Sequence, residues 1–304
     1  MSANTWMPGR RFVIGVPYFW LLLFFLLPFL ILLYISFVDM GDDIIPFKPL
    51  WDANGALHLK LENYWSVFID PDGGMLFDTL YVEAYGRSIL YAFATALLCL
   101  VFGYPFAYFM ARAPERFRPG LLMMVMLPFW TSFLLRIYAW KGLLSDYGII
   151  NRGLMALGLI DDPIPMLYTD ISMLVGMTYV YLPFMVLPLY ATLVKMDIRL
   201  LEAAYDLGTR PFKAFWLITV PLSKAGIIAG SVLVFVPSVG EFVIPSLLGG
   251  PENIMIGRVV WDEMFSSNNW PRATALAVIM IALIVVPLAM YNRAINARDG
   301  EAVR

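Results

Sequence analysis

Six apolar runs separated by polar segments dominate the chain. They cover roughly residues 12–38, 88–111, 120–140, 171–194, 225–248 and 272–292. Each run approaches the roughly 20 apolar residues that an α-helix needs to cross a bilayer. The first run has no charged residue and is too long for the apolar region of a signal peptide. The pattern predicts an all-α integral membrane protein with six transmembrane helices, the first of them uncleaved.

Arginine and lysine residues are distributed unevenly between the segments that connect these runs. If the N-terminus is cytoplasmic, 13 of the 21 basic residues lie in cytoplasmic segments. Basic residues concentrate on the cytoplasmic side of membrane proteins. We therefore expect both termini in the cytoplasm, a large periplasmic loop at 40–87 and a cytoplasmic loop at 195–223. Within the outer loop, residues 61–65 are expected to form a short surface helix. The whole chain, 1–304, is predicted to be one transmembrane domain.

The composition narrows the classes of function. Hydrophobic residues make up 61% of the chain and charged residues 14%, well below the roughly 25% typical of soluble domains. Cys99 is the single cysteine and His58 the single histidine, which argues against a disulfide within the chain, a His-based metal site and a catalytic triad. The sequence has no G-x-x-x-x-G-K-[ST] phosphate loop and no dinucleotide fingerprint. We expect a membrane protein that is not an enzyme, carries no cofactor or metal and binds no nucleic acid.

The loop at 195–223 has helical periodicity despite its polar character. Residues 197–207 place apolar side chains on one side of a short helix, and Gly208 can adopt a positive φ and terminate it. Thr209 is a plausible N-cap for a second short helix. Pro221 is expected to push Val220 out of helical geometry and so to end that second helix. One face of the second helix is apolar and consists of Phe212, Phe215, Trp216 and Ile218. The sequence predicts a helix, a tight glycine bend and a second helix.

The residues of this loop follow the order Glu-Ala-Ala, three residues, Gly, nine residues, Ile-x-x-Pro. This order resembles the coupling loop of the permease subunits of bacterial ABC importers, in which the last part reads Ile-x-Leu-Pro; Val220 replaces that leucine. The resemblance implies that the loop docks in a groove of a separate cytoplasmic ATPase, which binds ATP and Mg²⁺. The docking residues that it implies are Glu202, Ala203, Ala204, Gly208, Ile218 and Pro221.

Three other segments resemble the permeases of polyamine (putrescine and spermidine) importers. They are residues 127–140, 239–245 and 248–257. The resemblance implies the first of two different permeases in the inner membrane of a bacterium, working by alternating access. The partners that it implies are a second permease subunit, two cytoplasmic ATP-binding subunits and a periplasmic polyamine-binding protein, all assembled on the lipid bilayer.

Two charged residues interrupt the apolar runs, Arg136 in the third and Glu241 in the fifth. A carboxylate inside the membrane costs about 2–3.5 kcal/mol unless it faces water, a partner or a pore. Glu241 is therefore expected to face inward, either as a cation contact or gate or in a structural ion pair with Arg136. Four aromatic residues could offer ring faces to ammonium groups, or serve instead as packing and interfacial anchors: Trp130, Tyr179, Tyr181 and Trp261.

Alternative functions remain open at this point. The same permease architecture could carry another small solute, such as an amino acid, sulfate or an iron chelate. An ion-coupled secondary transporter would need several intramembrane titratable groups and inverted repeats, and neither is evident in the sequence. A passive assembly factor is not excluded by the charged loop alone.

Overall fold

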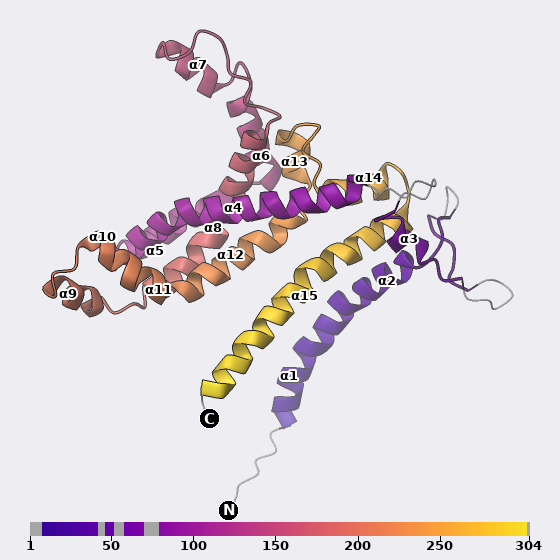
Figure 1. Ribbon diagram of the computed structural model, residues 1–304, viewed down its shortest axis with the longest axis horizontal. Coiled ribbons are helices and arrows are strands. Elements are labelled where there is room, and N and C mark those ends of the chain that lie inside the picture. The colour runs from indigo at the N-terminus through magenta and orange to yellow at the C-terminus, as the bar shows by residue number, and fades with distance from the viewer. Residues whose placement is uncertain (1–7, 42–45, 52–57, 70–78, 303–304) are drawn as a thin grey trace, which may run out of the picture. The chain divides into compact units, whose positions relative to one another are not determined.

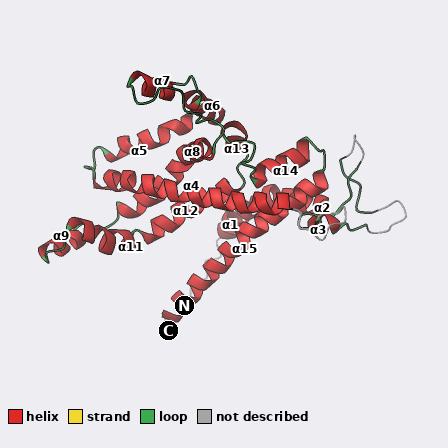
Figure 2. Cartoon of the chain, turned by 45° about the horizontal axis from the view of Figure 1, so that its top comes forward, coloured by secondary structure: helices red, strands yellow, loops and turns green. Residues whose placement is uncertain are grey.

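The computed structural model describes residues 8–41, 46–51, 58–69 and 79–302, and these are helical apart from loops and one isolated bridge between Met40 and Phe47 (Figures 1 and 2). The expected all-α class is confirmed for this part of the chain. Single helices that can span a membrane cover Phe12–Ser36, Leu80–Arg112, Asp170–Leu193 and Trp270–Met290. The described residues reach six spans only if each of two strongly bent helix pairs counts as one.

The chain divides into two compact units, Met1–Val82 with Val259–Arg304, and Glu83–Arg258. The first unit contains α1 (Pro8–Leu21), the π-turn η1 (Leu22–Leu26), α2 (Leu27–Ser36) and α3 (Glu62–Trp65). It also holds α15 (Trp270–Ala302) and most of α14 (Ile256–Phe265). Within this unit α15 packs along α2 and against α3.

The short helix α3 is fastened to the end of α2 by polar contacts, which confirms the surface helix expected at 61–65. Asn63 Nδ2 donates to the carbonyl oxygens of Ser36, at 3.0 Å, and Val38, at 2.8 Å. Nearby, Lys60 Nζ donates to Asp39 Oδ1 at 2.8 Å. This hydrogen bond lowers the pKa of Asp39 and raises the pKa of Lys60. The contacts order the chain just outside the first span.

The second unit contains most of the remaining helices. The first group is α4 (Thr79–Arg112, which begins in the first unit), α5 (Arg118–Met126), the 3₁₀ turn η2 (Leu127–Trp130), α6 (Phe133–Leu144), α7 (Ile149–Ala156) and α8 (Asp170–Leu193). The second group is α9 (Arg199–Asp206), α10 (Pro211–Ala214), the π-turn η3 (Phe215–Thr219), α11 (Val220–Leu222), α12 (Lys224–Val239) and α13 (Val243–Leu248).

The core of this unit is built on the close packing of α8 and α12. Gly226 and Gly230 lie one turn apart on α12 and face α8. A Cβ at Gly226 would lie 2.8 Å from the carbonyl oxygen of Pro188, and one at Gly230 would lie 2.7 Å from Met185 Sδ. Small residues four positions apart let two membrane helices approach closely. The glycine pair therefore sets how near α12 sits to α8.

Three of the predicted runs differ from the helices. The run 120–140 is not one helix, because η2 ends at Trp130 and α6 begins at Phe133 after a bend of 88°. The run predicted to begin at residue 88 belongs to α4, which already begins at Thr79. The run 225–248 is not one helix, because α12 ends at Val239 and α13 begins at Val243. Pro237 and Gly240 lie at this break, where proline removes a backbone donor and Gly240 is the C-cap. Glu241 therefore follows a helix end and does not lie on a continuous helix.

Candidate functional site

The loop at 195–223 forms the bent helical pair that the sequence predicted. Gly208 has φ +79° and follows α9. The N–H of Thr209 donates to the carbonyl oxygen of Ala204 at 3.0 Å, and the N–H of Gly208 donates to that of Tyr205 at 2.8 Å. This pair of bonds is a Schellman motif, which satisfies carbonyls at a helix end. Ala204 thus takes part in the bend through its backbone.

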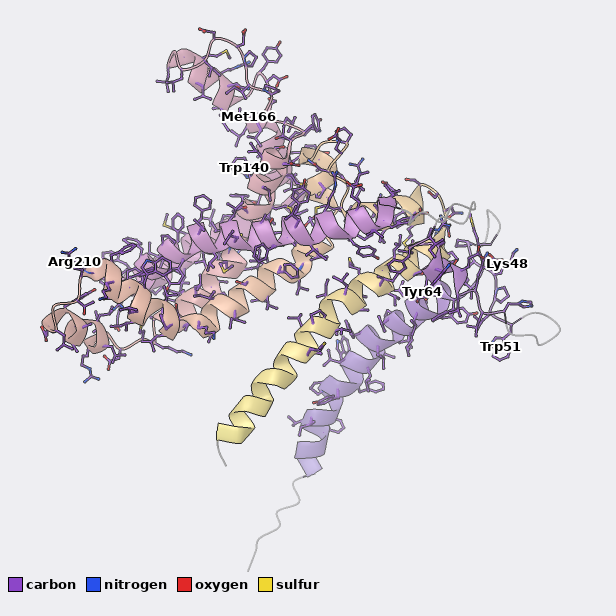
Figure 3. The ribbon with its side chains drawn as sticks, viewed as in Figure 1. Lys48, Trp51, Tyr64, Trp140, Met166 and Arg210 are labelled. Carbon is purple, nitrogen blue, oxygen red and sulfur yellow. The ribbon has the colours of Figure 1, made fainter. Side chains whose placement is uncertain are left out.

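The second helix of the loop differs from the prediction. Thr209 is not its N-cap; Arg210 precedes α10 in extended geometry and lies in the bend (Figure 3). Val220 has helical angles, φ −62° and ψ −49°, so Pro221 does not end the helix. The π-turn η3 precedes Pro221, and helical structure continues to Leu222. Proline is tolerated in the first turn of α11, because the N–H it lacks there has no partner in an ordinary helix start.

The outer surface of this loop carries large apolar side chains that the other described residues do not cover. Leu201 is buried, whereas Leu207 is 87% exposed and Phe212 is 77% exposed. Glu202 and Ala203 are exposed beside them, and Ala204 is partly exposed. At the start of the loop, Asp197 accepts hydrogen bonds from the side chain and backbone N–H of Arg199, which lowers the pKa of Asp197. The exposed face combines small and large apolar residues with the carboxylate of Glu202, which takes part in no ion pair of the described residues. Such a face suits docking on another protein.

The inner side of the loop is tied to the membrane helix α4. The ring of Phe215 contacts the rings of Tyr104 and Tyr108 edge-on, with centroids 5.4 and 5.8 Å apart. The hydroxyl groups of Tyr104 and Ser223 form a hydrogen bond of 2.7 Å. Both contacts join residues more than about a hundred positions apart in the sequence. These contacts join the loop directly to α4.

Glu241 holds the break between α12 and α13. Its Oε1 accepts hydrogen bonds from the backbone N–H groups of Phe242, Val243 and Ile244, at 3.1, 3.0 and 3.4 Å. Its Oε2 accepts from the hydroxyl of Tyr181 on α8 at 2.6 Å. The residue is only 9% exposed. Since backbone N–H groups inside a membrane need acceptors, this carboxylate satisfies the donors that the broken helix leaves open.

Arg136 lies on α6, just after a bend of 88° between η2 and α6. Its guanidinium stands over the rings of Phe129 and Phe133, 5.1 and 5.8 Å from their centroids. Its Nε and Nη1 are buried and have no hydrogen-bond partner among the described residues. The ion pair with Glu241 that the sequence left open is not among the ion pairs of the described residues.

A chain of aromatic rings connects Arg136 to Glu241. Phe129 contacts Phe184 with ring centroids 5.3 Å apart, and Phe184 contacts Tyr181 at 6.2 Å. Tyr181 then donates to Glu241. Sequence reasoning missed Phe129 and Phe184, since nothing in an apolar run marks one phenylalanine over another. The Leu-Pro-Phe-Trp-Thr-Ser segment itself was a signal of the bend, because proline and small polar residues weaken a helix.

The remaining aromatic candidates have neighbours of their own. Tyr179 packs edge-on against Trp140, with ring centroids 5.5 Å apart (Trp140 is labelled in Figure 3). Trp130 ends η2 with most of its surface exposed. Trp261 belongs to the first unit, where it packs against Phe265 at 4.3 Å. Of the sequence candidates for the path, Tyr181 and Glu241 are joined by a hydrogen bond within the second unit.

Comparisons with known proteins place these features in a context. Residues 100–298 match the family described as "Binding-protein-dependent transport system inner membrane component". The chain is 36% identical over 286 residues to a spermidine/putrescine transport system permease protein, PotB, of Haemophilus influenzae, covering 94% of this chain and 93% of that protein. It is 39% identical over 275 residues to PotB of Escherichia coli K12, covering 90% and 94%.

A solved structure has the same fold. It is a bacterial ABC transporter involved in the import of the acidic polysaccharide alginate, with a TM-score of 0.63 and 17% sequence identity. The match covers 94% of this chain and 96% of that chain. At this identity the likeness speaks for the fold alone.

Proposed function

We infer that this chain, which belongs to the family of binding-protein-dependent transport system inner membrane components, is a permease subunit of an ATP-driven importer in a bacterial inner membrane. It forms half of a translocation path and takes its energy from a separate ATPase. The single observation that carries the proposal is the bent helical pair at 195–223. Its outer face is apolar and exposed, while its inner face is bonded to a membrane helix.

The bent pair has the properties that a coupling element needs. The Schellman motif at Gly208 fixes the angle of the bend, so the loop keeps its shape under load. Ala203 and Glu202 offer close approach and a carboxylate to a basic group on the ATPase. Two ATP-binding subunits, which hold ATP and Mg²⁺, would move two such loops together and apart. The contact of Phe215 with α4 would pass that motion to the membrane helices, which alternate between outward-open and inward-open states.

The cargo of the importer is proposed to be a polyamine, putrescine or spermidine. Two relatives that share more than a third of their residues with this chain over most of their length carry spermidine/putrescine transport in their names. By the same similarity, the partners are a second permease subunit and a periplasmic polyamine-binding protein. Glu241, Tyr181, Arg136, Trp130, Tyr179 and Trp261 remain the proposed residues of the path or its gate.

The coupling role can be tested with an exposed alanine on the proposed docking face. Ala203→Trp adds bulk where the ATPase would bind, without filling a buried space, because Ala203 is exposed. In proteoliposomes with the second permease, the ATPase and the binding protein, we expect loss of binding-protein-stimulated ATP hydrolysis. Ala156→Trp, at an exposed helical position on α7, is the matched control and should leave hydrolysis unchanged. Stimulated hydrolysis that survives in the Ala203 variant would refute the coupling role.

The cargo can be tested in the same proteoliposomes. Labelled putrescine and spermidine should be taken up only with ATP and the binding protein present. An amino acid and sulfate serve as competitors that should leave this uptake unchanged. Uptake of one of those solutes in place of polyamines would keep the permease assignment and replace the cargo.

A further inference from the structure

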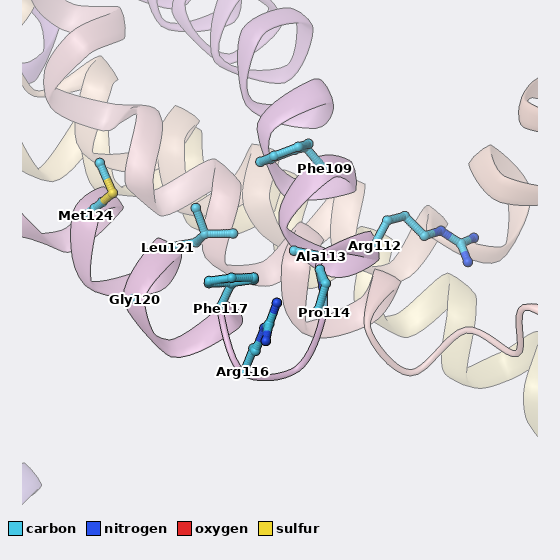
Figure 4. A pocket seen from close by; sticks show the side chains of 9 residues that line it. All are labelled: Phe109, Arg112, Ala113, Pro114, Arg116, Phe117, Gly120, Leu121 and Met124. Carbon is cyan, nitrogen blue, oxygen red and sulfur yellow. The ribbon is translucent and has the colours of Figure 1, made fainter.

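A pocket opens between the end of α4 and the start of α5 (Figure 4). Its volume is about 710 Å³, within the roughly 300–1,000 Å³ of small-molecule sites. Its wall is apolar and consists of Phe109, Phe117, Leu121 and Met124. Phe109 and Met124 are 64% and 70% exposed. The pocket therefore has an open apolar side rather than a sealed interior.

Cationic side chains lie at this pocket. The guanidinium of Arg116 stands 4.6 Å from the ring centroid of Phe117, and Figure 4 shows it between Phe117 and Pro114. Arg116 takes part in none of the ion pairs of the described residues. Arg118 is engaged elsewhere, since its Nε donates to the carbonyl oxygen of Ala113 at 2.9 Å. Arg112 points away from the apolar wall and stands over Tyr108, 5.3 Å from its ring centroid. Arg112 also lines the pocket, but its Nη2 is buried. Among the described residues, Arg116 is the exposed cation that lines the pocket and takes part in no ion pair.

The position of the pocket along the membrane helices decides which ligand it suits. It lies at the end of the span Leu80–Arg112, where the apolar helix surface ends. The residues around this end include three arginines, Arg112, Arg116 and Arg118, and one glutamate, Glu115. Tyr104 and Tyr108 of the same helix end contact Phe215 of the coupling loop. The pocket therefore faces the leaflet on the side of that loop. Basic groups beside membrane helices attract anionic lipid head groups.

We propose that this pocket binds an anionic phospholipid, with the phosphate on Arg116 and an acyl chain along Phe109, Phe117, Leu121 and Met124. A free phosphate would gain nothing from the open apolar wall. A segment of another protein would need a carboxylate of its own at Arg116, whereas the phosphates of a bilayer already lie at the ends of membrane spans such as Leu80–Arg112. The lipid contact stands independently of the proposed function, and only its assignment to the cytoplasmic leaflet rests on that function.

The proposal is tested by lipid binding to the purified full chain in detergent, measured by native mass spectrometry. The probes are palmitoyl-oleoyl phosphatidylglycerol and the phosphatidylcholine with the same acyl chains. We expect tighter binding of phosphatidylglycerol, and a loss of about fivefold in its affinity in Arg116→Gln, the effect of one basic residue at a membrane surface. Arg152→Gln removes the same charge from an exposed position on α7 and should leave the affinity unchanged.

A second variant tests the apolar half of the pocket while keeping its charge. Gly120 lines the pocket and has no atom within 4 Å of a built Cβ, so Gly120→Leu extends into the pocket without a backbone clash. It should weaken the binding of both lipids. Gel filtration and circular dichroism establish that each variant is folded.

Three results would overturn the proposal. The first is equal affinity for the two lipids, or an affinity that neither variant changes. The second is displacement of the lipid by inorganic phosphate at matched concentration, which would indicate a phosphate site. The third is a photoreactive residue at position 117 that, in the assembled transporter, captures another subunit and no lipid. The assay uses neither ATP nor transport, so its failure leaves the coupling test untouched.

Discussion

At the scale of single residues, Gly208 has the clearest physical reason for its identity. Its φ of +79° is a conformation that residues with a Cβ avoid, at a cost of about 1–2 kcal/mol. No atom lies within 4 Å of a built Cβ, so the penalty of a substitution is one of backbone conformation and not of space. The chemistry of the bend was visible in the sequence because it is local.

We predict a graded loss of coupling at Gly208. Asn tolerates positive φ better than Ala, and Ala better than Val. Binding-protein-stimulated ATP hydrolysis should therefore fall in the order Gly208, Gly208→Asn, Gly208→Ala, Gly208→Val. Gly142→Ala is the control, because Gly142 lies in helix α6 with open space around its Cβ and no positive φ. A series in which Asn and Val behave alike would contradict a backbone origin.

Glu241 gives a prediction that separates structure from transport. Glu241→Ala leaves backbone N–H groups at the start of α13 without their acceptor, and a buried unsatisfied donor costs about 1–3 kcal/mol. Glu241→Gln keeps an acceptor oxygen and should be less destabilising. Thermal unfolding of the purified chain in detergent measures both effects. Equal stability of the two variants would contradict the assigned capping role.

The variant Glu241→Gln also tests whether Glu241 belongs to the translocation path. If Glu241 also meets a cationic cargo in another state of the cycle, uptake of spermidine should fall in Glu241→Gln although the protein remains folded. Undiminished uptake would remove Glu241 from the path. The sequence marked this residue as costly in a membrane, but its partners were not predictable. They are the N–H groups of the residues that follow it, which it can reach because the helix breaks there, and a tyrosine from α8, which becomes a neighbour only when two helices pack.

At the scale of elements, the contact between α8 and α12 rests on the absence of side chains at two positions. Gly226→Ala would bring a Cβ 2.8 Å from the carbonyl oxygen of Pro188, a backbone atom that moves only with its helix. Forcing volume into a packed interface costs about 1–3 kcal/mol. We predict a lower thermal midpoint for this variant in detergent. Gly86→Ala, on α4 with nothing within 4 Å of its built Cβ, should not lower it.

The elements were predicted unevenly, and the reasons are physical. The run 171–194 matched α8 closely, because continuous apolar sequence and a capping box at Thr169 define that helix locally. The broken span at 240–242 was not predicted. Glu241 itself accepts hydrogen bonds from the freed backbone N–H groups, and its other oxygen bonds to Tyr181, which is distant in the sequence. Pro221 misled the prediction for the coupling loop. A proline in a sequence usually predicts the end of a helix, but here Pro221 lies in a new helical turn that follows the π-turn η3.

At the scale of the whole molecule, two features of the chain are those expected of one subunit of a larger assembly. The coupling loop exposes its apolar face, and Arg136 keeps two buried donors without partners among the described residues. Both features lower the stability of an isolated chain. Under the proposed function, an ATPase bound at the loop and a second permease in the membrane would relieve both.

Arg136 therefore leads to a prediction whose sign depends on assembly. In the isolated chain, two unsatisfied buried donors cost about 1–3 kcal/mol each, whereas stacking on two rings returns about 0.5–2 kcal/mol. The cost is the larger, so Arg136→Met should raise the thermal midpoint of the chain alone. In the assembled transporter, an acceptor from the second permease would satisfy the donors, and the same substitution should lower the midpoint. Arg152→Met, at an exposed position, is the control in both states. A change of the same sign in both states would show that no partner group meets Arg136.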